Sequence, residues 1–155
     1  MHTYILWIAT LAYALHIIEE YTFDWKKWAN SVLKLPVDYT HFAIVNGVVI
    51  VLGISCSVVG WNCAMFALSL PALMLINAAF MHVTPFVLTK GRFSPGLFTA
   101  VIAFVPTAIW SYYGAYRDGT LNVTTGIMSV AIGAALMACP ILMLKLRLHP
   151  YFKQQ

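Results

Sequence analysis

The chain has 155 residues, of which 61% are hydrophobic and only 9% are charged, and its mean hydropathy is +0.81. Soluble domains carry about 25% charged residues, so this composition excludes an ordinary soluble domain and indicates an integral membrane protein. The formal net charge is +4. In so apolar a chain, we interpret this charge as basic residues that anchor loops on one side of a membrane, and we expect no nucleic-acid partner.

The length of the chain limits the number of membrane crossings. A transmembrane helix needs about 20 residues, so there is room for about five spans and for no soluble domain. We therefore predict one all-α domain over residues 1–155, a polytopic bundle of transmembrane helices embedded in the lipid bilayer. The N-terminus lacks a basic region and an obvious small-residue cleavage site, which predicts that the first helix is retained and is not a signal peptide.

The first apolar segment, residues 4–21, is predicted to be a membrane-spanning helix. The next segment, residues 24–35, is too polar to span a membrane. Its Trp and Lys side chains are typical of the headgroup region, so we expect an interfacial helix or turn there.

The second and third spans are predicted at residues 39–59 and 61–88, with a tight turn at Gly60 between them. The third span contains two prolines, Pro71 and Pro85. A proline inside a helix frees a carbonyl group and kinks the chain, so we expect the third helix to be distorted.

The fourth and fifth spans are predicted at residues 95–116 and 123–144. The fourth begins with Pro95, which suits the first turn of a helix. The fifth has no ionisable group and carries small residues, which let helices approach closely: Gly126, Gly133, Ala134, Ala135 and Ala138. We expect this helix to pack closely, within the chain or against a second copy or another membrane protein.

Five spans place most of the basic residues on one side of the membrane: Lys26, Lys27, Lys34, Lys90, Arg92, Lys145, Arg147 and Lys153. Arg117 falls on the other side. By the positive-inside rule, the basic side is cytoplasmic. This pattern predicts a multi-pass protein with its N-terminus outside and its C-terminus in the cytoplasm.

Three ionisable residues, His16, Glu19 and Glu20, lie near the end of the first span. Residues three and four apart share a helix face, so both glutamates lie on the His16 side. A charge near the bilayer centre costs about 2.5–3.5 kcal/mol on insertion scales, and neighbouring carboxylates repel each other. No predicted span contains Lys or Arg, so a bound cation or protons must neutralise these glutamates.

Three further polar residues, Asn46, Asn77 and His82, are predicted in the same half of the bilayer. Each has an ordinary structural interpretation, because an asparagine can join helices and a histidine can bond a carbonyl group freed by Pro85. Their common depth favours a shared site. Asn77 and His82 are five residues apart and point about 140° away from each other on an ideal helix. They converge only if Pro85 distorts the helix or a π-bulge opens.

Two imidazoles and a carboxylate suit a divalent transition metal, with zinc as the first candidate and iron as the second. We assign His16, His82 and one of Glu19 and Glu20 as metal ligands, and the other glutamate as a general base on a water molecule. A site with two metals and redox chemistry is a variant. Two amides are given supporting catalytic roles, in which they orient ligands or polarise a carbonyl group: Asn46 and Asn77.

The motif His16-x-x-Glu19-Glu20 on an apolar span is similar to the one that names the HXXEE family of small bacterial membrane proteins. The resemblance extends to Asn46-Gly47, Asn77-x-x-x-x-His82 and Arg92-Phe93-Ser94-Pro95-Gly96, and it covers about the first two thirds of the chain. It implies a multi-pass protein of the bacterial inner membrane. The family is uncharacterised and is suspected to contain enzymes, proteases among them.

A looser similarity exists to CAAX-processing-type membrane proteases. These combine neighbouring glutamates with His and Asn from other helices near the cytoplasmic side. In this chain, Asp24 stands four residues after Glu20, where those proteases have an Arg. The chain therefore departs from the protease pattern next to the glutamate pair.

Together, these features predict an intramembrane metal-dependent enzyme. We expect a hydrolase that acts from the cytoplasmic leaflet on an apolar small molecule, a lipid or a membrane peptide. Two alternatives stay open. The same side chains could relay protons or cations across the membrane, or the chain could be a non-catalytic accessory subunit that docks a partner through residues 123–144.

Overall fold

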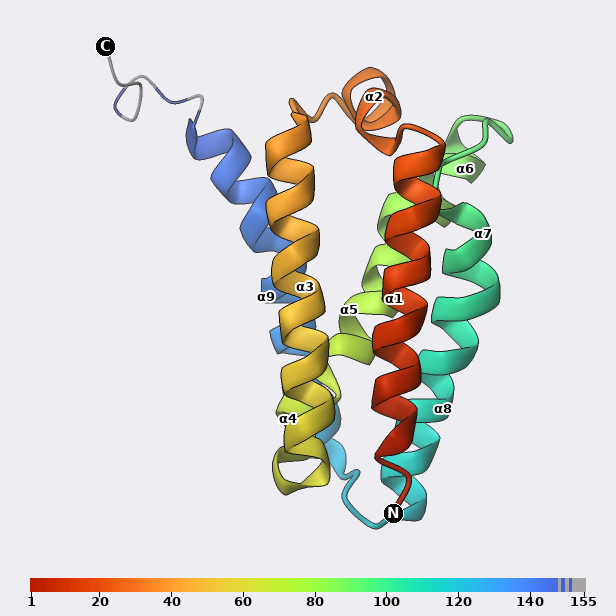
Figure 1. The fold of residues 1–155 in the computed structure, drawn as a ribbon, viewed down its shortest axis with the longest axis vertical. Helices are drawn as coiled ribbons and strands as arrows, with labels where there is room; N and C mark the ends of the chain where they lie inside the picture. The colour runs from red at the N-terminus through yellow and green to blue at the C-terminus, as the bar shows by residue number, and fades with distance from the viewer. Residues whose placement is uncertain (148, 150, 152–155) are drawn as a thin grey trace.

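The structure is a computed structural model that describes residues 1–147, 149 and 151. Every regular element in this part of the chain is a helix, which confirms the all-α class (Figure 1). Lys153, which was predicted on the cytoplasmic side, lies outside the described residues.

The first helix, α1 (Tyr4–Thr22), packs against α3 (Tyr39–Val59), α5 (Ser69–Asn77) and α8 (Val105–Arg117) (Figure 1). Its buried residues lie on one side of the helix, where they form one stripe along its length: Ile5, Leu6, Ala9, Thr10, Ala12, Tyr13, His16, Glu19 and Glu20. The stripe is apolar over most of its length and ends in the three ionisable residues.

Two short elements follow α1 and lie across one end of the bundle (Figure 1). They are α2 (Trp25–Trp28) and a π-helical turn, η1 (Ala29–Leu33). The Asp24 side chain begins α2 by accepting a hydrogen bond from the Lys27 N–H at 3.1 Å, as N-cap residues do. The interfacial segment expected at residues 24–35 is therefore helical over most of its length.

Between α3 and α5 the chain reverses direction through two short elements, the 3₁₀ turn η2 (Gly60–Cys63) and α4 (Ala64–Ala67). Gly60 has a φ of 51°, a conformation that suits glycine because it lacks a Cβ atom. The third predicted span begins with these turns, and its long helical part starts only at Ser69.

The third long helical run consists of α5, the π-helical segment η3 (Ala78–Val83) and α6 (Thr84–Leu88). The distortion that the sequence predicted near Pro85 is thus present as a wide helical turn just before that proline. A third π-helical segment, η4 (Ala100–Phe104), follows the short α7 (Leu97–Thr99) and leads into α8.

The last helix, α9 (Val123–Arg147), packs mainly on α5. A Cβ atom built on Gly133 would lie 2.8 Å from the Cβ of Ala72 and 2.9 Å from the backbone nitrogen of Leu73. Glycine therefore permits this close helix contact. This part of the small-residue pattern serves packing within the chain, and docking of a partner on α9 stays a prediction.

Four helical runs in the described chain are long and apolar enough to cross a membrane: Tyr39–Ala67, Ser69–Leu88, Leu97–Arg117 and Val123–Arg147. They indicate a multi-pass membrane protein. The 19-residue α1 is not among them, because its ionisable residues lower its mean hydropathy. The fifth span and the orientation in the membrane stay predictions.

The two ends of the bundle differ in charge. The Lys-rich α2, the loop between α6 and α7 that carries Lys90 and Arg92, and the C-terminal end of α9 lie at one end (Figure 1). At the other end, the Asp118 carboxylate accepts two hydrogen bonds from His2, one from its backbone N–H and one from its ring Nδ1 at 2.8 Å. It accepts a third from Trp61 Nε1 at 2.8 Å. These bonds, led by the one from the His2 backbone, lower the pKa of Asp118 to about 2, and they fasten the start of α1 to the end of α8.

Candidate metal centre

Helix α1 presents three ionisable side chains to the interior of the bundle. His16 and Glu20 are one helical turn apart on the same face, and Glu19 is their neighbour. The exposed fractions of His16, Glu19 and Glu20 are 0%, 8% and 5%. His16 is therefore fully buried, and Glu19 and Glu20 keep only a small exposed surface.

The π-helical segment η3 supplies a second imidazole, His82, which is fully buried. Hydrogen bonds between residues five apart widen this turn. From the sequence, Asn77 and His82 can converge only with a distortion of this kind. Asn77 closes α5 and His82 lies near the end of η3. The wide turn directs His82 toward α1.

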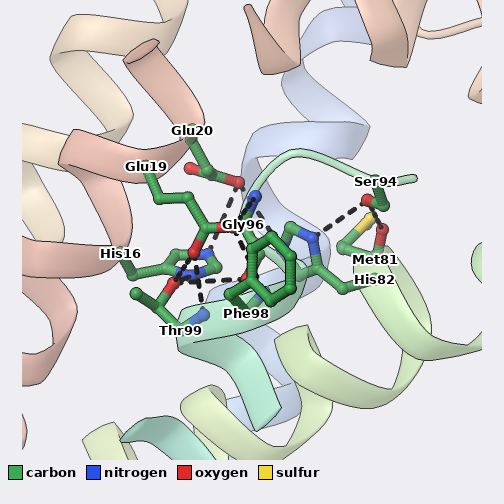
Figure 2. A network of polar contacts seen from close by, with 9 residues as sticks. All are labelled: His16, Glu19, Glu20, Met81, His82, Ser94, Gly96, Phe98 and Thr99. Atoms are coloured by element: carbon green, nitrogen blue, oxygen red, sulfur yellow. Dashed lines mark hydrogen bonds and ion pairs between the residues drawn. The ribbon is translucent and has the colours of Figure 1, made fainter. Parts of the chain in front are cut away.

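His16, Glu20 and His82 point toward one another (Figure 2). Glu20 Oε1 lies 3.5 Å from His16 Nε2 and 3.5 Å from His82 Nε2. The two rings are nearly perpendicular, with centroids 4.8 Å apart. One candidate ligand atom from each residue lies within 4.8 Å of the other two, so this buried group could hold a metal ion.

The tautomer of His16 follows from its neighbours. The hydroxyl oxygen of Thr99 lies 2.8 Å from His16 Nδ1 and 2.6 Å from Glu19 Oε2. A carboxylate accepts hydrogen bonds, and the hydroxyl has a single proton to donate. Thr99 therefore donates to Glu19 and accepts from the Nδ1–H of His16, which leaves a lone pair on His16 Nε2.

His82 is held in the same way by Ser94. The serine hydroxyl lies 3.1 Å from His82 Nδ1 and 3.3 Å from the carbonyl oxygen of Met81. Because a carbonyl group accepts only, Ser94 donates to Met81 and accepts from His82 Nδ1–H. The Nε2 atoms of both histidines have no hydrogen-bond partner. Two imidazole lone pairs thus face one carboxylate oxygen.

A glycine backbone allows the three residues to come this close. Gly96 has a φ of 94°, and a Cβ atom built on it would lie 2.6 Å from His82 Cε1, 2.7 Å from His16 Cε1 and 3.0 Å from Glu20 Cγ. Any larger residue would collide with both rings. Gly96 therefore closes one side of the group (Figure 2).

Glu19 takes a different role from Glu20. Its Oε1 accepts hydrogen bonds from the backbone N–H groups of Gly96 and Phe98 at 3.1 Å each, and its Oε2 accepts from the backbone N–H and the hydroxyl of Thr99 at 2.8 and 2.6 Å. Each carboxylate oxygen thus has two donors. Glu19 fastens residues 96–99 to α1, while Glu20 faces the histidines.

No basic side chain neutralises the group. Within the described residues, the groups within 4.0 Å of the Glu20 carboxylate that could carry positive charge are the two imidazoles, which are neutral in the tautomers assigned above, and no Lys or Arg nitrogen lies within 4.0 Å of Glu19 or Glu20. Phe104 stacks near His16 with ring centroids 4.3 Å apart, and Tyr13 packs on Phe104 at 5.0 Å. The group is therefore closed by aromatic side chains on the side toward the bundle centre.

The two asparagines of the sequence prediction lie beside a cavity between α1, α3, α5 and α9. Glu20, Asn46 and Asn77 line it, whereas His16 and His82 do not. Asn77 is buried, and its side-chain carbonyl oxygen has no hydrogen-bond partner. Asn46 is half-buried. Glu20 is thus the residue that connects the cavity to the histidines, and the catalytic roles assigned to the asparagines stay predictions.

Sequence reasoning did not identify Ser94 and Thr99 as partners of the histidines. Ser94 belongs to the segment before the fourth span that carried the family resemblance, so a signal existed for it. Thr99 offered none, because a single threonine in an apolar helix is common and usually bonds its own backbone. Gly96 stood in the same resemblance, but its contact with both rings is visible only in three dimensions.

These features define a multi-pass membrane protein with a buried His–Glu–His group that could hold a metal ion. A family model described as a protein of unknown function with HXXEE motif matches residues 7–111, more than half of the chain. The chain therefore belongs to the HXXEE family, as the resemblance implied. Neither the curated proteins nor the solved structures include a match to it.

Proposed function

We propose that this protein is an intramembrane metal-dependent enzyme whose metal is held by His16, Glu20 and His82. One observation carries the proposal: three hydrogen-bond acceptors converge in a buried site without a donor between them. Like partial charges repel, and burial strengthens the repulsion. A bound cation turns this repulsion into coordination.

The spacing of the acceptors fits a small divalent ion. Zinc binds imidazole nitrogen and carboxylate oxygen at about 2.0–2.2 Å, which places two ligands of a tetrahedral site about 3.3–3.5 Å apart. Glu20 Oε1 is 3.5 Å from each Nε2. Two histidines and one carboxylate also suit non-haem iron, so zinc is our first assignment and iron the second.

The surrounding residues support coordination by the histidines. A ligating histidine commonly donates its other ring N–H to a hydrogen-bond acceptor, which fixes its tautomer and orientation. The hydroxyl groups of Thr99 and Ser94 accept these hydrogen bonds from His16 and His82. Glu19 in turn holds Thr99. We therefore assign Glu19 the positioning of this segment, and its role as a general base stays a prediction.

We propose hydrolysis as the reaction. A divalent ion at this position would supply Lewis-acid polarisation of a substrate carbonyl group and activation of water. Glu20 lines the adjoining cavity and also contacts both histidines, so a substrate in the cavity would lie next to the ion. Asn77, whose side-chain carbonyl oxygen lacks a hydrogen-bond partner, would orient that substrate. We further propose that α1 is a fifth span and that the end of the bundle with the metal centre faces the cytoplasm.

Metal content measured on protein purified without added chelator tests the proposal. We expect about one equivalent of zinc or iron per wild-type chain. Glu20→Gln and His82→Ala should each reduce metal affinity more than tenfold, because each removes a ligand. His41→Ala is the matched control, since His41 lines the cavity but lies outside the His–Glu–His group, and it should keep the metal.

Equal metal content in wild type and His82→Ala would contradict the proposal. Metal-free wild-type protein that carries a proton or cation flux in proteoliposomes, with the flux abolished in Glu20→Gln, would support a relay instead.

A further inference from the structure

We propose that the cavity beside Glu20 binds a single-chain amphiphile whose hydroxyl or N–H group donates a hydrogen bond to Asn77. The inference rests on the proposed function and deepens it, because it names the class of substrate and the residue that selects it. It concerns the cavity between α1, α3, α5 and α9, which His16 and His82 do not line.

The walls of this cavity suit a hydrocarbon chain. Helix α3 contributes Val45 and Val49, α5 contributes Leu73, and α9 contributes Leu136, Met137 and Ile141. Ligand sites are mostly apolar, with a few polar groups that fix orientation. An acyl or isoprenoid chain therefore matches the walls, and a strongly polar substrate does not.

Asn77 defines the polar end of the ligand. Its exposed fraction is 8%, and its carbonyl oxygen is buried without a partner. A buried acceptor without a donor is costly, and a ligand that brings the donor removes the cost. Glu20 lines the same cavity. The hydroxyl or N–H group of the ligand, bound to Asn77, would thus lie beside the Glu20 carboxylate, which also contacts His16 and His82.

The cavity adjoins a second pocket at the basic end of the bundle. This pocket lies between the end of α1 and the start of α3 and is lined by Asp24, Lys26 and Tyr39. It shares Glu20, Trp25 and Phe42 with the cavity. Under the proposal, water and polar products would approach Glu20 from this pocket, while the apolar chain would occupy the walls of α3, α5 and α9.

Two probes of equal chain length test the inference without turnover. Hexadecan-1-ol carries a hydroxyl donor, and its methyl ether lacks one. Both are titrated against the metal-loaded protein in nanodiscs, with binding followed by native mass spectrometry and metal content measured on the same samples. We expect the wild type to bind the alcohol about tenfold more tightly than the ether, since a site that bonds a hydroxyl rejects the analogue without it.

Two variants and a matched control locate the site. Asn77→Leu should remove the preference for the alcohol. Val49→Phe should weaken both probes tenfold or more by filling the cavity. Val48→Phe adds the same volume at the neighbouring position of α3, where the side chain is exposed on the outer face, and should change neither probe. Metal content should stay at the wild-type level in all three.

Equal binding of alcohol and ether by the metal-loaded wild type would overturn the inference, as would wild-type binding by Val49→Phe. In both cases an unchanged metal content would mean that the proposed metal centre is not contradicted. A wild type without metal would instead overturn the proposed function. The wild-type comparison of the two probes needs no variant, so the test does not depend on whether Val49→Phe folds.

Discussion

Gly96 shows at the level of one residue why His16, Glu20 and His82 can meet. A Cβ atom at this position would lie 2.6 Å from the His82 ring and 2.7 Å from the His16 ring, closer than real Cβ atoms approach other heavy atoms. The obstacle would be two buried rings, each held by a hydroxyl group, so neither can move aside without losing a hydrogen bond. Glycine is therefore needed at this position for two reasons: the backbone has a positive φ, and the two histidine rings leave no space for a Cβ atom.

Gly96→Ala should disrupt the metal centre. We expect a loss of metal affinity of more than tenfold and a destabilisation of about 1–3 kcal/mol, the usual range for overpacking. Metal titration and thermal unfolding measure the two effects. Gly91→Ala is the control, because Gly91 also has a positive φ, 92°, but its Cβ would meet only Phe86 at 3.9 Å. Equal metal affinity in the two variants would contradict the role given to Gly96.

Some site residues could be predicted from the sequence because they are costly inside a membrane. His16, Glu19, Glu20 and His82 stand out for that reason. The sequence could not decide which glutamate faces the histidines, since both lie on the His16 side of the helix. The decision depends on the donors of residues 96–99, which bind Glu19. These donors come from a segment about 80 residues away.

At the level of elements, the His–Glu–His group depends on departures from the ideal α-helix. Two π-helical segments, η3 and η4, contact each other, and η3 carries His82. π-Helical turns often occur at functional sites. Pro85 predicted a distortion of the third helix, but the sequence did not show where the wide turn would lie or that it would contact η4 and α7.

Insertion of one alanine after Ala79 tests how the register of η3 places His82. Ala79 is exposed on the outer face of η3, so the insertion point lies away from buried side chains. His82 then follows Asn77 by six residues, which turns His82 by about 100° relative to α5. We expect loss of metal binding with helical content unchanged by circular dichroism.

A substitution at the same position, Ala79→Val, should keep both the metal and the helical content. Wild-type metal affinity in the insertion variant would show that the register of η3 does not place His82.

At the level of the whole molecule, composition alone predicts an all-helical membrane protein, because 61% hydrophobic residues cannot be hidden in a core of this size. The structure agrees in its class and in four long apolar helices. It could not be predicted that α1 would lie among α3, α5 and α8 with its polar end covered. That arrangement depends on which helix pairs fit, as at Gly53 of α3, where a Cβ atom would lie 2.8 Å from Thr10 Oγ1 of α1.

The two ends of the whole bundle differ in charge. Basic residues gather at the end where α2 and the loop between α6 and α7 lie, and the polar end of α1 lies there too. A metal centre buried beneath that end would be close to the cytoplasmic headgroups if the positive-inside rule holds for this chain. The cavity of α3, α5 and α9 then lies within the adjoining leaflet.

X-ray absorption spectroscopy of the metal-loaded protein tests the central claim most directly. The account predicts nitrogen and oxygen ligands at about 2.0–2.2 Å with the scattering pattern of two imidazole rings. His82→Ala should show one ring. A sulfur ligand, or a spectrum unchanged when both His16 and His82 are replaced by Ala, would contradict it.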